Sequence, residues 1–230
     1  MRGLSRRILM WWCLTGPCLL VSGLGLDVMT SKKTSESAVY PRFVDRLPAI
    51  PEGQWTEAQK AAVAEFSAGR GYGPLGPFWV MLRSPEVMLR AKAMGDYLRY
   101  RNRLPKDISE MVILQTARNW SQSFEWVHHA RFAREYGLAD DIIAAIADGR
   151  RPAVLSIAQA AAYDFTVELQ THKRVSDVTY ARAVAAFGEP GVIDLIGVQG
   201  YYTMLAMMMN VARTGVGEAE AHEGLERWPE

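Results

Sequence analysis

The chain has 230 residues, of which 49% are apolar and 22% are charged, proportions typical of a folded globular chain rather than a disordered one. Its formal net charge is +1 and it carries no basic stripe, so nucleic acid is not an expected partner. Both cysteines, Cys13 and Cys18, lie near the N-terminus. The rest of the chain therefore offers no disulfide, thiolate metal ligand or cysteine nucleophile.

Residues 1–28 combine early arginines with an apolar run that begins at Ile8, a pattern that resembles a secretory signal. The pair Arg6-Arg7 also resembles a twin-arginine export sequence, which would direct the protein to the periplasm. A small-x-small cleavage site is missing, however, and the segment makes a weak membrane anchor. The alternative is an overextended start with Met29 as the true first residue, and we favour it; a cytoplasmic protein is then expected.

Residues 29–55 are polar and interrupted by prolines, which predicts an extended arm. From Thr56 onward the apolar spacing is helical, except for a glycine-rich loop over residues 69–77. The pattern predicts an all-α fold with a single helical domain of about seven to eight helices over residues 56–213, followed by a polar tail, 214–230. The predicted helices cover residues 56–68, 84–101, 107 onward, 121–136, 140–147, 156–171, 176–187 and 190–212.

The last predicted helix is almost uncharged. We interpret it as a buried core helix, since Asp194, Gln199 and Asn210 argue against a membrane span. A helix that is apolar nearly all round needs cover on every side, which a domain of this size supplies only in part. Clustered methionines between Met204 and Met209 are typical of adaptable packing at such a contact. The helix therefore predicts a homo-oligomer.

Polar and aromatic groups gather between Glu110 and His129, around Trp120, Phe124 and Trp126. Glu125 and His129 are four residues apart, on one face of a helix, and Gln122 lies about one turn earlier on that face. If the helix that carries Glu110 packs antiparallel to this one, Glu110 also approaches His129. Surroundings of low polarity would shift both titrations of such a carboxylate–imidazole pair. Whether Glu110 or Glu125 is the partner of His129 stays open.

Each of these residues also has a structural interpretation. Asp107 and Glu110 have the spacing of a capping box, which would make Glu110 a helix cap. Glu125 and His129 would form a surface ion pair worth a few tenths of a kcal/mol, roughly the usual value. A metal ion would need Glu110, Glu125 and His129 together, and their spacing matches no ligand motif. Phosphate-binding glycine loops are also missing, so neither a metal nor another cofactor is expected.

Several segments together resemble the carboxymuconolactone decarboxylase family, which includes the alkyl hydroperoxidase D-like proteins. The resemblance extends over roughly residues 42–213 and rests on the order and spacing of its segments. Glu125 to His129 resembles the family's Tyr-Glu-Trp-x-x-His segment. The other matching segments are Gly76-Pro77-Phe78, Ser84-Pro85, Leu104-Pro105-x-x-x-Ser109-Glu110, Ala133 to Leu138, Val175-Ser176-Asp177, and Leu195 to Tyr202.

This resemblance implies an alkyl hydroperoxidase D-like fold and a trimeric or hexameric assembly. It matches His129 to the family's histidine and Glu110 to the glutamate nineteen residues earlier. The peroxidase branch carries a Cys-x-x-Cys pair where this chain has Gln122 and Glu125. Since thiol–disulfide chemistry requires a thiolate, a peroxidase of that type is not expected.

The resemblance thus favours a cofactor-free acid–base enzyme similar to 4-carboxymuconolactone decarboxylase, a lyase of aromatic compound catabolism, acting on a small lactone or oxo-acid. His129 would be the proton donor, oriented by Glu110 or Glu125. Two alternatives stay open: a non-catalytic oligomeric ligand-binding protein and, disfavoured, a peroxidase that uses external thiols. Residues expected at the substrate are Trp126, Gln122, Arg118 and Tyr201, with Tyr202 shaping the pocket and Arg118, Arg131 and Arg42 as candidate cations for an anionic substrate.

Overall fold

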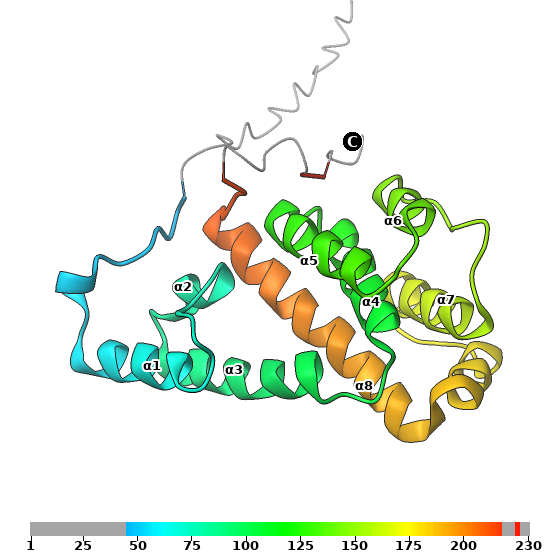
Figure 1. The fold of residues 1–230 in the computed structure, drawn as a ribbon, viewed down its shortest axis with the longest axis horizontal. Helices are drawn as coiled ribbons and strands as arrows, with labels where there is room; N and C mark the ends of the chain where they lie inside the picture. Colours follow the sequence, from blue (N-terminus) through cyan, green and yellow to red (C-terminus); the bar gives the residue numbers. More distant parts are fainter. Residues whose placement is uncertain (1–44, 218–223, 226–230) are drawn as a thin grey trace, which may run out of the picture. The chain divides into compact units, whose positions relative to one another are not determined.

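The structure, a computed structural model, describes residues 45–217 and 224–225 (Figure 1). Arg42, both cysteines and the export-like segment 1–28 lie outside the described residues, as do most of the arm and of the C-terminal tail. The predicted helical domain, residues 56–213, is by contrast described completely.

The described residues form eight α-helices and one short 3-10 helix, and no strand occurs among them. This confirms the all-α prediction of seven to eight helices. The 3-10 helix η1, Glu52–Gln54, lies in the segment predicted as an extended arm. The α-helices are α1 Glu57–Ser67, α2 Pro77–Met81, α3 Pro85–Tyr100, α4 Lys106–Asn119, α5 Ser123–Glu135, α6 Asp140–Ala147, α7 Ile157–His172 and α8 Asp177–Ala212.

Local sequence signals account for several helix starts. Thr56 and Gln59 form a capping box at the start of α1, because each side chain bonds the backbone N–H of the other residue. Ser156 and Gln159 do the same at α7. At α3 the side chain of Ser84 makes no cap bond, and Pro85 at the first helical position supplies the start instead.

The segment predicted as a loop over residues 69–77 ends in a helix that the sequence pattern missed. Gly69, Gly71 and Gly76 have positive φ angles, as a glycine-rich loop allows. Pro77 then begins α2, which has only five residues. A helix shorter than two turns contains no complete apolar period, so its spacing gives no signal.

Helix α8 joins the two helices predicted over residues 176–187 and 190–212. The chain bends at Gly188, whose φ of 68° and ψ of 167° are not helical, and Pro190 follows directly. The two predicted segments are therefore both helical, and they meet at a kink rather than at a loop.

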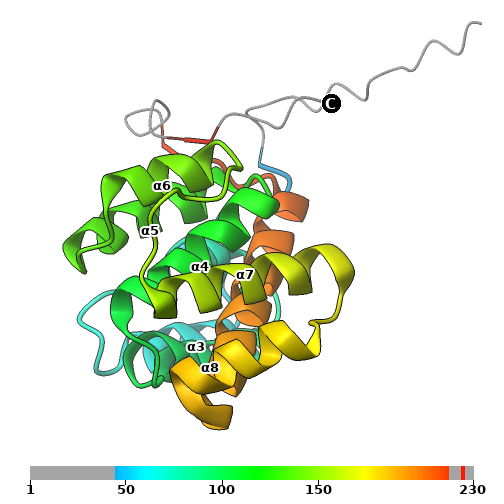
Figure 2. The ribbon, with the colours of Figure 1, turned by 90° about the vertical axis from the view of Figure 1, so that its right-hand side faces the viewer.

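Helix α8 crosses the domain, with α1, α2 and α3 on one side and α4 to α7 on the other (Figure 1). It packs against α2, α3, α4 and α7, and a second view shows α7 crossing in front of α4 and α8 (Figure 2). Helix α4 is buried without a break from Ile108 to Arg118. These two helices therefore supply the centre of the core, and polar side chains on them are held in apolar surroundings.

Among the described residues, α8 alone has the length and apolar composition that a membrane-spanning helix would need. More than half of its most apolar stretch is buried inside the domain, as in a core helix. Asp194 and Gln199 are buried there too, and both form hydrogen bonds to other helices or turns of the domain.

Candidate functional site

A tight helical hairpin brings the predicted site residues together. Helices α4 and α5 are joined by Trp120, Ser121 and Gln122, and a connection this short makes the two helices antiparallel neighbours. Ser121 takes a left-handed φ of 47°, and the Gln122 side chain accepts a hydrogen bond from the N–H of Phe124. Positions before the turn on α4 consequently face positions after it on α5.

Glu110 and His129 meet across this hairpin. Oε2 of Glu110 lies 2.6 Å from Nδ1 of His129, and each residue is only 4% exposed. Glu110 therefore does not cap its own helix: α4 begins at Lys106 after Pro105, without a side-chain cap bond. The capping-box interpretation is wrong, because Asp107 instead accepts a hydrogen bond from Nε2 of Gln159 on α7.

The hydrogen bond between Glu110 and His129 assigns different roles to the two ring nitrogens. A carboxylate can only accept, so Nδ1 of His129 donates to it and its proton is engaged. The other nitrogen, Nε2, is then the one that takes up or delivers a proton. A carboxylate in this position stabilises the imidazolium that forms when Nε2 is protonated.

Aromatic rings surround His129. The ring of Tyr202 on α8 meets it edge-on, with centroids 4.9 Å apart, and Phe132 lies at 6.2 Å. Burial raises the pKa of the Tyr202 hydroxyl, so this group stays a neutral phenol. The pair thus lies where charges are poorly screened by water, which strengthens its interactions with other charges.

Glu125 is a second buried carboxyl group, on α5 one turn before His129. It is 3% exposed, and neither of its carboxylate oxygens has a hydrogen-bond partner within the described part of the chain. Burial raises the pKa of Glu125 well above 4.5, which favours the protonated acid. The surface ion-pair interpretation of Glu125 and His129 is therefore wrong, and Glu110 is the partner of the histidine.

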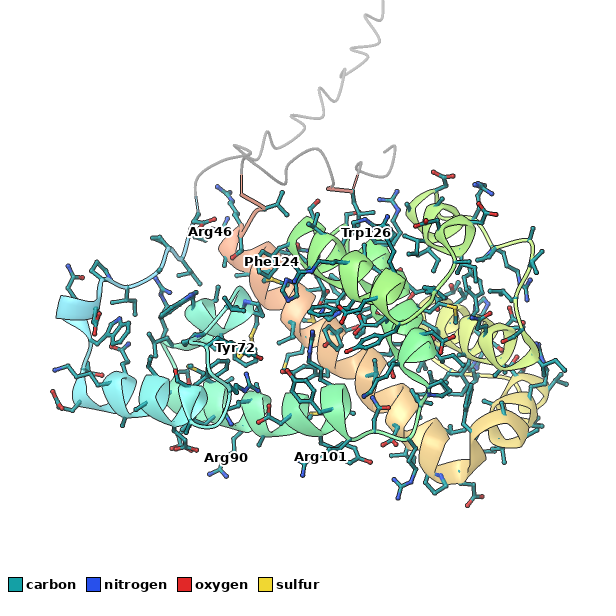
Figure 3. The ribbon with its side chains drawn as sticks, in the orientation of Figure 1. Arg46, Tyr72, Arg90, Arg101, Phe124 and Trp126 are labelled. Carbon is teal, nitrogen blue, oxygen red and sulfur yellow. The ribbon has the colours of Figure 1, made fainter. Side chains whose placement is uncertain are left out.

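His128 differs from its neighbour. Its ring stacks on Phe124 at a centroid distance of 6.0 Å and meets Phe132 edge-on at 5.3 Å. Burial, together with the charge of His129, lowers the pKa of His128 to about 4, so its ring stays neutral near pH 7. Phe124 points from α5 toward the loop before α2 and lies against Gly76, which has no side chain to block it (Figure 3).

The remaining predicted residues are distributed around the pair. Trp126 and Tyr201 are buried, and the Tyr201 hydroxyl lies against Gly95 of α3. Gln122 ties α5 to α8, since its Nε2 donates to Oδ1 of Asn210, so its polar atoms serve the fold. Arg118 is buried near the end of α4.

Sequence reasoning missed a cation close to the pair. The guanidinium of Arg99, on α3, stacks over the ring of Phe132 at 4.5 Å. Burial lowers its pKa, but the charges of Tyr202, Glu110 and Tyr100 and a hydrogen bond with Tyr202 raise the pKa overall. A signal did exist: Arg99 shares the apolar face of its helix with Met88, Ala91 and Gly95. Arg131, the cation predicted from α5, is exposed, although it also contacts Phe132.

A metal centre finds no support in the geometry. Over residues 45–217 and 224–225, no group of three or more His, Cys, Asp or Glu side chains is arranged to hold a metal ion. Of the three residues that such a centre would need, Glu110 and His129 bond each other and Glu125 has no polar partner in the described chain.

Comparison with known proteins gives one match to a protein family. Residues 85–168, which include α3 to α5 and both members of the pair, match the model of the Carboxymuconolactone decarboxylase family. No curated protein matches the chain in sequence.

Solved structures share the fold at low sequence identity. A peroxidase-related protein from Ralstonia eutropha JMP134, with an alkylhydroperoxidase AhpD core, is 16% identical, with a TM-score of 0.62 over 78% of this chain and 95% of that one. A variant of the debrominase Bmp8 in complex with 2,3,4-tribromopyrrole is 10% identical, with a TM-score of 0.60 over 77% of this chain and 94% of that one. Residues 85–168 are thus similar to the carboxymuconolactone decarboxylase family, and the described domain shares the fold of these solved structures.

Proposed function

We propose that the protein is a cofactor-free acid–base enzyme, most similar in chemistry to the decarboxylases of the carboxymuconolactone decarboxylase family, that acts on a small lactone or oxo-acid. The observation that carries this proposal is the buried hydrogen bond of 2.6 Å between Glu110 and His129. A histidine that is oriented by a carboxylate and enclosed by aromatic rings is suited to moving a proton to or from carbon.

In the proposed reaction the bond between a substrate carbon and its carboxylate breaks, and carbon dioxide leaves. The electron pair stays on the carbon and is delocalised into the lactone or oxo group. Nε2 of protonated His129 then delivers its proton to that carbon, and the ring regains a proton from water. Glu110 stabilises the charged imidazolium before the transfer and holds the ring in one orientation.

Glu125 is the second proton source in this proposal. Because burial keeps it in the acid form, it is able to donate a proton to an anion, which an ionised carboxylate cannot do.

Peroxidase chemistry of the Cys-x-x-Cys type is disfavoured. The two positions that carry the thiols in that branch hold Gln122, whose amide bonds Asn210 and the backbone of Phe124, and Glu125. One structural neighbour is a debrominase with 2,3,4-tribromopyrrole bound, so the fold also accommodates chemistry on halogenated rings.

Release of carbon dioxide from 4-carboxymuconolactone and from a panel of other lactone acids and oxo-acids tests the proposal. We expect turnover of at least one of these compounds by the full chain. His129→Ala should lower kcat by about 10²–10⁴, the usual contribution of a general acid. The matched control, His172→Ala, alters a histidine at the exposed end of α7 and should retain wild-type activity. Equally low activity, at the background rate, in wild type and His129→Ala would leave binding without turnover as the function.

A further inference from the structure

Arg99 is a cation beside the proposed reacting centre that the mechanism has not used. It is half-buried in the last turn of α3, and its guanidinium reaches the ring of Phe132 on α5. Two neighbouring arginines of the same helix region, Arg90 and Arg101, point away from the domain and are exposed (Figure 3). Turning a guanidinium toward the interior costs free energy, so this orientation calls for an explanation.

Arg99 is connected to His129 through two rings. Its guanidinium lies 4.5 Å from the centre of the Phe132 ring, which is itself 6.2 Å from the ring of His129. Arg99 also interacts with the hydroxyl of Tyr202, whose ring is 4.9 Å from that of His129. The cation and the imidazole therefore share the same two aromatic neighbours.

The described residues leave much of this guanidinium without a hydrogen-bond partner. The charge of Glu110 acts on Arg99, but the short hydrogen bond of Glu110 is made with His129. Among the described residues, Arg99 takes part in no salt bridge, and the hydrogen bond that bears on its side chain is the one with Tyr202. A guanidinium carries five N–H donors in a planar fork that matches a carboxylate. Most of these donors remain for a ligand.

We propose that Arg99 is the substrate-binding cation of this site and holds a carboxylate that the substrate keeps throughout the reaction. The inference rests on the proposed function, because it takes Glu110 and His129 as the reacting centre. The carboxylate on Arg99 cannot be the one that is lost, since a cation that stabilised it would favour the ground state over the transition state. Because Arg99 and His129 share Phe132 and Tyr202 as neighbours, a small ring attached to the bound carboxylate would lie near His129.

Binding of benzoate and of its neutral counterpart benzamide to the full chain, measured by ligand-observed NMR titration, tests the inference without any turnover. We expect wild type to bind benzoate at least about 10-fold more tightly than benzamide, about 1.4 kcal/mol, as a charge-assisted contact provides. In Arg99→Gln this ratio should fall below about threefold. Arg99→Lys keeps the charge and should keep part of the preference. The control Arg101→Gln, on the exposed side, should keep all of it.

Three results would overturn the inference: a preference for benzoate that survives in Arg99→Gln, one that is lost in Arg101→Gln, or no detectable binding of either probe to wild type. Thermal unfolding by circular dichroism checks the fold of each variant, and Arg99→Lys decides the question if Arg99→Gln does not fold. His129→Ala should retain the wild-type preference. A carboxylate preference that depends on Arg99 without turnover of any acid would uphold the inference and reject the decarboxylase function.

Discussion

At the scale of single residues, the site rests on two buried carboxyl groups of one helical hairpin that differ in their partners. Glu110 bonds Nδ1 of His129 at 2.6 Å. Glu125 is equally buried but has no polar partner in the described part of the chain, so burial keeps it protonated. One hairpin thus offers both an acceptor that orients the histidine and a neutral acid.

The buried acid predicts how stability depends on pH. Burial raises the folded-state pKa of Glu125 above its unfolded value of 4.5, so the unfolded chain loses this proton first as pH rises. Glu125 therefore lowers stability with rising pH, from about 4.5 up to its folded pKa, by up to about 1.4 kcal/mol per pH unit. In Glu125→Gln this component should disappear, which guanidinium denaturation at pH 5, 6, 7 and 8 would measure.

The control for that series is Glu135→Gln, which removes an exposed carboxylate from the same helix. Its stability should follow wild type across the whole pH range. Identical pH profiles for wild type and Glu125→Gln would mean that Glu125 is ionised in the folded protein, and its role as a proton source would then have to be abandoned.

Sequence reasoning reached much of the site, and its errors have physical causes. The spacing of Glu110 and His129 placed both residues on helices, and the short turn between them made an antiparallel contact predictable. Spacing could not decide between Glu110 and Glu125 as the partner, because that depends on the rotation of α4 about its axis. The place of Arg99 on the apolar face of α3 indicated that it turns inward, but only tertiary packing brings its guanidinium to Phe132 of the hairpin, so its place at the site was missed.

At the scale of elements, Asp194 joins α8 to α3 and to the turn that leads into α4. It is 4% exposed, and its carboxylate accepts hydrogen bonds from the Tyr97 hydroxyl and the Arg103 N–H, each at 2.9 Å. From the sequence alone, Asp194 indicates only that the last helix does not span a membrane. Its partners lie about ninety residues away, so no local pattern reveals this role.

Asp194→Ala should lower the free energy of unfolding by about 2–4 kcal/mol, because it leaves two polar groups without their acceptor. Asp194→Asn keeps one acceptor oxygen and should cost less. The control is Asp141→Ala, which replaces an exposed aspartate of α6, and chemical denaturation measures the free energy of unfolding of each variant. If Asp194→Ala were as stable as Asp141→Ala, the contact would contribute nothing to the placement of α3.

The helix boundaries show the same limits of local information. Sequence signals at Thr56, Ser156 and Ser176 correspond to real caps, so the starts of α1, α7 and α8 were predictable. Helix α2 is too short for a periodic pattern, and the helical continuation through Gly188 depends on packing of both halves of α8. The spacing of apolar residues indicates that a segment is helical, but it does not show where that helix ends against its neighbours.

At the scale of the whole molecule, α8 has one apolar face that no other described residue covers. Ile193, Ile196, Met207 and Val211 follow helical spacing along that face and are all exposed. We propose that other copies of the chain cover it, as the sequence pattern predicted. A continuous exposed apolar strip is typical of an interface rather than of a solvent-facing surface.

Light scattering after gel filtration should therefore give a mass that is a multiple of 25.7 kDa. The double variant Ile193→Glu with Ile196→Glu should reduce the mass to that of one chain, because charges cannot be buried at the contact without partners. Val154→Glu introduces a charge at an exposed position away from α8 and should leave the mass unchanged. A monomeric wild type would refute the proposed assembly.

The most direct test of the acid–base site is a double-mutant cycle of Glu110→Gln and His129→Ala, measured as kcat/KM for carbon dioxide release. If Glu110 works through the imidazole, each single variant should lose about 10²-fold or more. The double variant should then be within about threefold of His129→Ala alone, because the carboxylate has no further task once the ring is gone. Losses that multiply in the double variant would show that the two residues act independently, and the paired site would be disproved.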